Sequence, residues 1–263
     1  MYKQKYAKYK NKYIALKHQH DNILYDYTNS EEVLKYIHSI LPKKSNSNPN
    51  PYVLVLYGPP GSGKTLSKKF ILDELHLDNN YVYFSEDEFA YHTKQFEELK
   101  NNSAHKQVDI LQSEYNVIRK ATSYIMYTLL GLALMYKLNA VIEMTGNGLN
   151  WYMTHLINEF HHHKYKIHLV YPYVNDVNIL IERSIKRGNK EFRYVPEKYI
   201  RDVFVRSKDN FIKLINSEDV VKFNNIYVYD AVKIKLDGSN FKQCIIYQYD
   251  SGKILVPFNN VSW

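Results

Sequence analysis

The sequence predicts an α/β fold in which a parallel sheet carries helices on both faces, and three observations support this. From residue 51 to about residue 230, short apolar runs alternate with helical stretches, the pattern of strand–helix–strand units. A glycine-rich segment that fits a phosphate-binding loop follows the first apolar run. With 263 residues, the chain can bury a core of this kind as one domain with extensions.

The phosphate-binding loop (P-loop) is the run Gly58-Pro-Pro-Gly-Ser-Gly-Lys-Thr65, which fits G-x-x-x-x-G-K-[ST] at each fixed position. It lies between the apolar run Tyr52–Tyr57 and the helix-like stretch Leu66–Leu77. Small residues let backbone N–H groups approach a polyphosphate, and the helix N-terminus adds positive potential. Lys64 is expected to reach the β- and γ-phosphates, and the Thr65 hydroxyl to hold Mg²⁺. The sequence therefore predicts a P-loop NTPase-type fold that binds ATP and Mg²⁺, with nucleotide-binding residues Gly58, Gly61, Ser62, Gly63, Lys64 and Thr65.

A core is predicted over residues 51–235, followed by a small β appendage over residues 236–263. Strands are expected at Tyr52–Tyr57, Tyr81–Ser85, Ala140–Met144, His168–Tyr173 and Ile226–Tyr229. Helices are expected at Lys64–Leu77, Val108–Tyr136, Trp151–His162, Val174–Lys186 and Pro196–Ile215. Short strands at Val232–Leu236 and Cys244–Tyr249, with turns at Asp237-Gly238 and Ser251-Gly252, are expected to form the C-terminal hairpin. A ligand site is expected at the carboxyl ends of the parallel strands.

Residues 1–50 predict a basic helical arm and a linker. The first 20 residues hold six lysines and no acid, which leaves only about +2 of the net charge of +8 for the rest of the chain. An aromatic stripe at helical spacing and a second helix, Glu31–Leu41, precede the Pro- and Asn-rich linker. The stripe consists of Tyr2, Tyr6, Tyr9, Tyr13 and Leu16. Two interpretations stay open: contact with an anionic surface, nucleic acid or a protein partner, or a solvated helix whose tyrosines pack on the body.

Composition favours a reducing compartment and predicts no membrane-spanning segment. Cys244 is the only cysteine, so no internal disulfide can form. The most apolar segment, Tyr124–Tyr136, is too short to cross a bilayer and predicts a buried helix. The expected location is cytoplasmic, or virion-associated for a viral protein, because abundant Tyr, Lys, Asn and Ile are typical of A/T-rich genomes such as those of large DNA viruses.

Two carboxylates near predicted strand ends are candidates for the reaction chemistry. Asp87, in Ser85-Glu-Asp-Glu-Phe89 after the second strand, is the candidate general base for an acceptor hydroxyl, while Glu86 and Glu88 are candidates for solvated neighbours. The strand Val141-Ile-Glu-Met-Thr145 ends in Glu143 and Thr145, which are candidates for orienting the acceptor. Glu143 could alternatively cap the next helix.

Arginines are rare and clustered in this chain. The sequence has 29 lysines and six arginines, yet Arg183, Arg187 and Arg193 fall within eleven residues and Arg201 and Arg206 follow. The planar guanidinium binds phosphate with two parallel hydrogen bonds, so the cluster predicts a lid over the transferring phosphoryl group. A solvated helix face with acidic partners is the alternative.

In their order and spacing, these motifs resemble the zeta-toxin family of P-loop kinases over about residues 52–230. The matching segments are Gly58–Thr65, Asp87–Phe89, Val141–Gly146, Ile181–Arg183, Arg193–Pro196 and Ile226–Asp230. The resemblance implies a kinase that uses ATP and Mg²⁺ to phosphorylate a sugar hydroxyl, notably that of UDP-N-acetylglucosamine. It implies that Lys64 and Thr65 hold phosphate and metal, that Asp87 is the base and that Glu143 helps to hold the acceptor. It also implies that Arg183 and Arg193 clamp the γ-phosphate.

The chain departs from the family pattern on the acceptor side. Ala90 stands where the family has a basic residue, the following His-Pro is replaced by His92-Thr93 one position early, Met144 replaces a Gly, and Asn147 replaces an Arg. These departures leave the sugar-nucleotide specificity open, and an antitoxin partner does not follow from this sequence.

Two other functions remain open from the sequence. One is a nucleoside or polynucleotide kinase, for which the basic arm is favourable but Ala90 and Tyr91 are not, because polynucleotide kinases usually carry an Arg there. The other is a nucleotide-binding structural protein with little turnover. The run His161-His-His163 does not predict a metal site, because consecutive side chains point to different faces of a helix.

Overall fold

The computed structural model describes residues 35, 39, 49–103, 106–122 and 125–257. Most of the predicted arm, its tyrosine stripe, the helix Glu31–Leu41 and the linker lie outside these residues. The chain divides into two compact units. The sheet unit consists of Asn50–Tyr81, Val141–Lys186 and Val195–Trp263, and the helical unit is made chiefly of Val82–Ala140 and Arg187–Tyr194.

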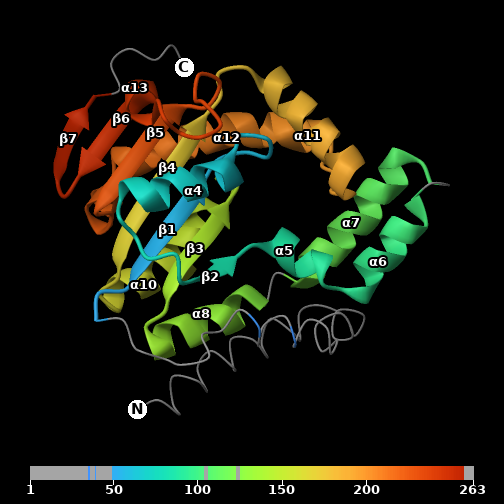
Figure 1. Cartoon of the computed structure of the whole chain (residues 1–263), viewed down its shortest axis with the longest axis horizontal. Helices are drawn as coiled ribbons and strands as arrows, with labels where there is room; N and C mark the ends of the chain where they lie inside the picture. Colours follow the sequence, from blue (N-terminus) through green and yellow to red (C-terminus); the bar gives the residue numbers. More distant parts are fainter. Residues whose placement is uncertain (1–34, 36–38, 40–48, 104–105, 123–124, 258–263) are drawn as a thin grey trace. The chain divides into compact units, whose positions relative to one another are not determined.

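A seven-stranded sheet with the order β2-β3-β1-β4-β5-β6-β7 confirms the predicted α/β fold. Its strands are β1 (Tyr52–Tyr57), β2 (Tyr81–Phe84), β3 (Asn139–Met144), β4 (Lys166–Tyr173), β5 (Asn225–Asp230), β6 (Ile245–Asp250) and β7 (Lys253–Val256). β1, β4 and β5 pair in parallel, whereas β6 pairs antiparallel with both β5 and β7, at the red edge of the sheet in Figure 1. The C-terminal hairpin is thus joined to the main sheet through β5.

Continuous apolar runs form the central strands because both of their faces are covered. Every residue of β1 is buried, and in β4 only Lys166 at the start is exposed. β1 is offset on β4 so that Tyr52 pairs with Lys166 and Leu56 pairs with Val170. The loop that follows β1 therefore starts at the end of a buried strand.

The helices agree broadly with the sequence prediction. They are α4 (Lys64–Glu74), α5 (Glu86–Tyr91), α6 (Lys94–Asn101), α7 (Val108–Thr122), α8 (Ile125–Tyr136), α9 (Leu149–Tyr152), α10 (Asn158–His162), α11 (Val177–Glu191), α12 (Glu197–Ile215) and α13 (Phe241–Cys244). The expected helix Val108–Tyr136 corresponds to α7 and α8, which lie on either side of residues 123–124, outside the described residues. α5 and α6 were not predicted as helices. A π-helical segment, Met153–Ile157, joins α9 to α10, and a 3₁₀ turn, Glu218–Lys222, follows α12.

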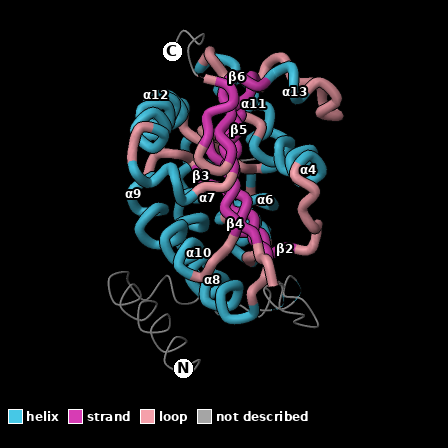
Figure 2. Tube along the Cα trace, turned by 90° about the vertical axis from the view of Figure 1, so that its left-hand side faces the viewer, coloured by secondary structure: helices cyan, strands magenta, loops and turns pink. Residues whose placement is uncertain are grey.

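Helices cover both faces of the sheet within the sheet unit, as Figure 2 shows with α4 on one side and α12, α9 and α10 on the other. On the α4 side, Ser67 shares a 2.7 Å hydrogen bond with the hydroxyl of Tyr229. On the α12 side, the Tyr57 hydroxyl donates to the backbone oxygen of Ser207 at 2.7 Å. These buried polar contacts join each helix to a strand at a defined position.

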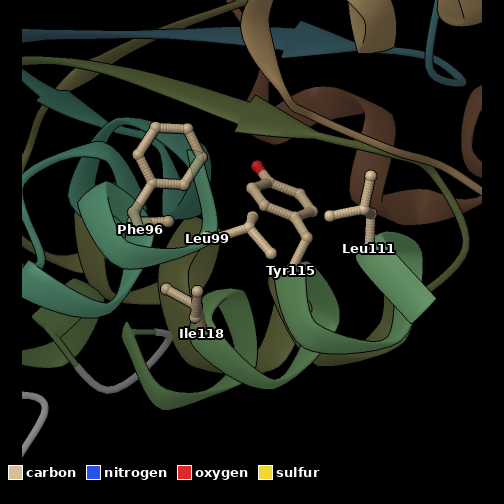
Figure 3. Packing of buried hydrophobic residues seen from close by; sticks show 6 residues of the cluster. Phe96, Leu99, Leu111, Tyr115 and Ile118 are labelled. Carbon is tan, nitrogen blue, oxygen red and sulfur yellow. The ribbon is translucent and has the colours of Figure 1, made fainter. Parts of the chain in front are cut away.

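The helical unit has an apolar cluster of its own, shown in Figure 3. It consists of Ala90, Phe96, Leu99, Leu111, Tyr115 and Ile118 from α5, α6 and α7. Both short helices begin at capping residues, because the Ser85 hydroxyl accepts from Glu88 N and the Thr93 hydroxyl accepts from Phe96 N. The three acidic residues after Ser85 also suit the positive end of α5, so the segment that carries Asp87 is helical.

The predicted strand at Val232–Leu236 is wrong, because this segment consists of turns. The carboxylate of Asp230 accepts hydrogen bonds from the backbone N–H groups of Val232 and Lys233 at 3.0 and 3.2 Å. The side chain of Asn240 accepts from Lys235 N at 2.8 Å. These side chains take the place of a partner strand, which is how Asp and Asn favour turns.

Candidate functional site

The P-loop connects β1 to α4 and adopts a conformation that depends on its glycines. Gly61 has φ = 79°, and a Cβ at this position would lie 2.6 Å from the backbone oxygen of Leu180. Gly63 caps α4 with φ = 98°, which a side chain rarely adopts even though open space surrounds it. The loop leads directly into the N-terminus of α4, and a glycine-rich loop before a helix N-terminus is an arrangement that binds phosphate.

Lys64 is buried in the loop, with its side-chain nitrogen donating to two loop carbonyls. The distances from Nζ are 2.7 Å to Gly58 O and 2.9 Å to Pro59 O. These two carbonyls orient the ammonium. The loop therefore carries a positioned cation where the motif predicts contact with phosphate oxygens.

Two buried hydroxyls at the loop have no hydrogen-bond partner among the residues that the structure describes. They are Ser62 Oγ, within the loop, and Ser184 Oγ on α11. The Ser184 hydroxyl lies 3.0 Å from the position that a Cβ of Gly61 would take, so it borders the loop directly. Unsatisfied buried donors are costly, and an anion bound by the loop would satisfy such groups.

The Thr65 hydroxyl donates to Glu143 Oε1 at 3.1 Å. A hydroxyl and a carboxylate oxygen at the start of α4 are the hard oxygen ligands that Mg²⁺ prefers, so this pair fits a magnesium ion. The sequence predicted Thr65 for this role but expected Glu143 on the acceptor side. Elsewhere in the described part of the chain, no group of three or more His, Cys, Asp or Glu side chains could hold a metal ion.

Arg183, on α11, reaches the same loop. Its guanidinium donates to Gly61 O and to Ala231 O, both at 3.4 Å. Arg183 is therefore beside the P-loop, in the region where the sequence predicts that it contacts phosphate.

The loop after β3 is fixed by α12. Asn210 Nδ2 donates to Gly146 O at 2.8 Å, and Arg206 donates to Asn147 Oδ1 at 3.2 Å. Gly146 has φ = 84°, and a Cβ there would lie 2.6 Å from Ser207. Thr145, half-buried, lies at the start of this loop. A guanidinium from α12 thus lies beside the position where the family resemblance has an arginine and this chain has Asn147.

Asp87 lies in a cationic and aromatic environment within the helical unit. Tyr115 donates to Asp87 Oδ1, and Arg193 forms an ion pair with Oδ2. Burial alone would raise the pKa of Asp87, but the charges of Arg193 and Arg119, the Tyr115 hydrogen bond and Arg187 hold it below the usual value. Asp87 is therefore an ionised carboxylate that contacts Arg193 directly. The sequence analysis had assigned Asp87 to the acceptor hydroxyl and Arg193 to the γ-phosphate.

Two more arginines of the helical unit are paired with carboxylates. Arg119 NH1 lies 2.7 Å from Glu86 Oε2, and Arg187 Nε lies 2.5 Å from Glu191 Oε2. Burial raises the pKa of Glu86, against the lowering effect of Arg119. The neighbour that the sequence left as a candidate solvated residue is thus part of an ion pair.

Three site residues were missed by sequence reasoning. Tyr115 occupies an apolar position of α7, between Leu111 and Ile118 at helical spacing, so its pattern predicted only a core residue. Arg119 carried a usable signal, because an arginine is unusual in this lysine-rich chain. Ser184 carried none, because a buried serine in a helix has no sequence signature.

The sequence profile of the zeta toxin family matches residues 37–240, which is most of the chain. The chain belongs to the zeta toxin family. The resemblance inferred from the motifs is confirmed, and the chain is a P-loop phosphotransferase, a kinase that uses a nucleotide.

Known proteins similar to this zeta toxin relative include one from a giant virus. "Uncharacterized protein L872" of Acanthamoeba polyphaga mimivirus is 27% identical over 252 residues, covering 84% of this chain and 69% of that protein. A solved structure of the PezAT toxin–antitoxin system of Streptococcus pneumoniae superposes with a TM-score of 0.59 at 20% identity, covering 86% of this chain and 82% of the other. The AvrRxo1-ORF1:-ORF2 structure with ATP gives 0.57 at 14% identity, covering 86% and 64%. These structural matches show the fold.

Within the described helices, none is both long and apolar enough to cross a membrane. α8, from the most apolar segment, has Leu129, Leu130 and Ala133 buried in the protein. The buried helix predicted for this segment is confirmed for these residues.

Proposed function

We propose that this chain transfers the γ-phosphoryl group of ATP to a hydroxyl of a small molecule, with a UDP-sugar such as UDP-N-acetylglucosamine as the first candidate acceptor. One observation carries the proposal: Lys64, the Thr65–Glu143 pair and Arg183 all meet at one P-loop. This is a cation for the phosphates, an oxygen pair for a metal and a guanidinium for developing charge, which phosphoryl transfer requires together.

Thr65 and Glu143 would hold the magnesium ion. When bound there, Mg²⁺ neutralises charge on the phosphate oxygens. Lys64 would bind the β- and γ-phosphates, and the P-loop N–H groups would orient them. Arg183 and Arg193 would stabilise the charge on the transferring group, as the family resemblance implies.

Asp87 is the proposed general base. As the acceptor oxygen forms its bond to the γ-phosphorus, the bond from phosphorus to the bridging oxygen breaks and ADP leaves. The hydroxyl proton then passes to the carboxylate of Asp87. A carboxylate with a lowered pKa is ionised at neutral pH, which is the form that can accept a proton.

The acceptor side differs from the family pattern in ways that alter recognition. Ala90 is wholly buried in the helical cluster, and Met144 is buried in β3, so neither can present a charge to a ligand. Arg206, which is exposed and bonded to Asn147, offers a guanidinium at the loop after β3. We infer that Arg206 supplies the positive charge for an anionic group of the acceptor there, while Thr145 contacts its hydroxyls.

The test is label transfer from γ-labelled ATP by the purified full chain, with and without UDP-N-acetylglucosamine, followed by mass spectrometry. Label on the sugar nucleotide is the expected result. Label that appears only in free phosphate at a rate unaffected by the sugar would reject this acceptor, and a panel of nucleosides and 5′-hydroxyl oligonucleotides would then test the alternative kinase functions. The basic arm supports the oligonucleotide alternative, through its charge alone.

A further inference from the structure

The two oxygens of Asp87 have partners of different kinds. Oδ1 accepts the hydrogen bond of the Tyr115 phenol, and Oδ2 is paired with the guanidinium of Arg193. Both ion-pair partners are nearly buried, with 10% of the Asp87 side chain and 12% of the Arg193 side chain exposed. Each partner stabilises the ionised carboxylate and makes it a weaker base, so Asp87 becomes a stronger base when one of the two partners leaves.

Tyr115 is held too firmly to be the partner that leaves. Only 1% of it is exposed, and its ring packs edge-on to Phe96 with centroids 6.1 Å apart. Figure 3 shows the ring between Leu99 and Leu111, with the phenolic oxygen pointing out of the cluster. Burial, followed by the charge of Asp87, raises the pKa of Tyr115, so the phenol keeps its proton and remains a donor.

Arg193 is held in a different way. It follows the end of α11 at Glu191 and precedes α12, in a connecting segment without helix or strand structure. The Arg193 guanidinium is charged, whereas the Tyr115 phenol is neutral, and phosphate oxygens can pair with a guanidinium as well as a carboxylate can. Moving Arg193 from Asp87 to an anion therefore costs less free energy than moving Tyr115 out of its apolar cluster.

We propose that Tyr115 is a positioning residue for the base. Tyr115 holds Oδ1 of Asp87, so that Oδ2 takes up the proton of the substrate hydroxyl once Arg193 has left Oδ2. This inference rests on the proposed function. The proton passes from the acceptor hydroxyl to Oδ2 as the new oxygen–phosphorus bond forms and ADP leaves. Tyr115 keeps its own proton throughout.

The pH dependence follows from the groups that face Asp87. They are Tyr115 and Arg119 from α7, Glu86 and Tyr91 from α5, Arg187 from α11 and Arg193. The Tyr115 hydrogen bond lowers the pKa of Asp87 by stabilising the carboxylate. Loss of this donor raises that pKa, so the acidic limb of the kcat profile moves to higher pH.

The experiment compares Tyr115→Phe with Tyr91→Phe in the full chain. Tyr91 packs against the same cluster, with its ring 4.9 Å from Phe96, but its hydroxyl donates to Glu191 at 3.4 Å. For Tyr115→Phe we expect a fall in kcat of about 10- to 100-fold, as when a hydrogen-bonded partner of an active-site ligand is removed. The KM for ATP should be unchanged and the acidic limb should lie at higher pH. Tyr91→Phe removes no hydrogen bond to Asp87, so it should change kcat and the acidic limb less than Tyr115→Phe does.

A well-folded Tyr115→Phe variant with the wild-type kcat and acidic limb would overturn the inference. If that variant does not fold, 3-fluorotyrosine at position 115 keeps the hydroxyl and strengthens it as a donor, so the acidic limb should move to lower pH. An unmoved limb would also overturn the inference. Full transfer by Asp87→Asn is a different result, because it would reject the base itself and hence the proposed mechanism.

Discussion

The cations beside the P-loop and the arginines around Asp87 have different kinds of partner. In the sheet unit, Lys64 and Arg183 donate to neutral carbonyls of the P-loop region. In the helical unit, Arg193, Arg119 and Arg187 each contact a carboxylate. A carbonyl partner does not neutralise a cation, whereas a carboxylate partner neutralises an arginine until the pair exchanges.

This difference indicates that phosphate binding and proton transfer are assigned to different units. The sheet unit holds the groups that are proposed to bind phosphate. The helical unit keeps a carboxylate ionised and covered. We therefore expect mutations in the sheet unit to weaken nucleotide or metal binding, and mutations around Asp87 to slow the chemical step without weakening ATP binding.

The largest effect is expected for Lys64→Ala. Removal of the only loop ammonium should abolish nucleotide-dependent transfer and weaken ATP binding, as measured by calorimetry and label transfer. Lys69→Ala, an exposed lysine on the same helix, is the matched control and should behave as wild type. Normal ATP affinity in Lys64→Ala would break the assignment of phosphate binding to the sheet unit.

Glu143→Gln separates the two roles considered for Glu143. The amide can still accept from Thr65, but it lacks the charge that favours a metal. We expect the Mg²⁺ concentration for half-maximal rate to rise about 10- to 100-fold. The control is Glu182→Gln, whose carboxylate pairs with Lys186 on the surface of α11. Unchanged Mg²⁺ dependence with a raised KM for the acceptor would return Glu143 to the acceptor role.

Arg206→Ala should have a smaller effect, confined to the acceptor. Loss of one charge-assisted contact, about 1.4 kcal/mol, raises the KM for an anionic acceptor about tenfold. Initial-rate measurements should show no change in the KM for ATP. Arg201→Ala, on the same helix and paired with Glu197, is the control. Equal effects of the two variants would remove Arg206 from the acceptor site.

Deletion of residues 1–41 should have the smallest effect on catalysis. We expect kcat to stay within about twofold of wild type, because the lost charges contribute only screened, long-range interactions. A large fall in kcat with an intact fold would contradict an accessory role for the arm.

The sheet unit could be predicted well because its signals are local. A buried strand, two glycines at fixed spacing followed by Lys64 and Thr65, and a helix specify the P-loop between β1 and α4 without reference to distant residues. The bounds of β1 were predicted to the residue, whereas those of the other parallel strands were off by one or two residues at an end. Regular backbone follows from periodicity, so these elements needed no tertiary information.

The helical unit could be predicted only in part because its site depends on partners far apart in the sequence. Asp87 meets Tyr115 and Arg193, which are 28 and 106 positions later in the sequence. Nothing in the spacing of these residues announces their contact. The strand predicted at Val232–Leu236 was wrong for the reverse reason. Its alternating pattern suggested a strand, but the nearby side chains of Asp230 and Asn240 accept hydrogen bonds from its backbone N–H groups.

The most direct test of this division of tasks is Asp87→Asn, with ATP affinity and phosphoryl transfer measured on the same preparation. We expect the dissociation constant for ATP to stay within about twofold, and transfer to fall by about 10²- to 10⁴-fold, the contribution of a general base. Full transfer in this variant, or a loss of ATP binding equal to the loss of transfer, would contradict the account.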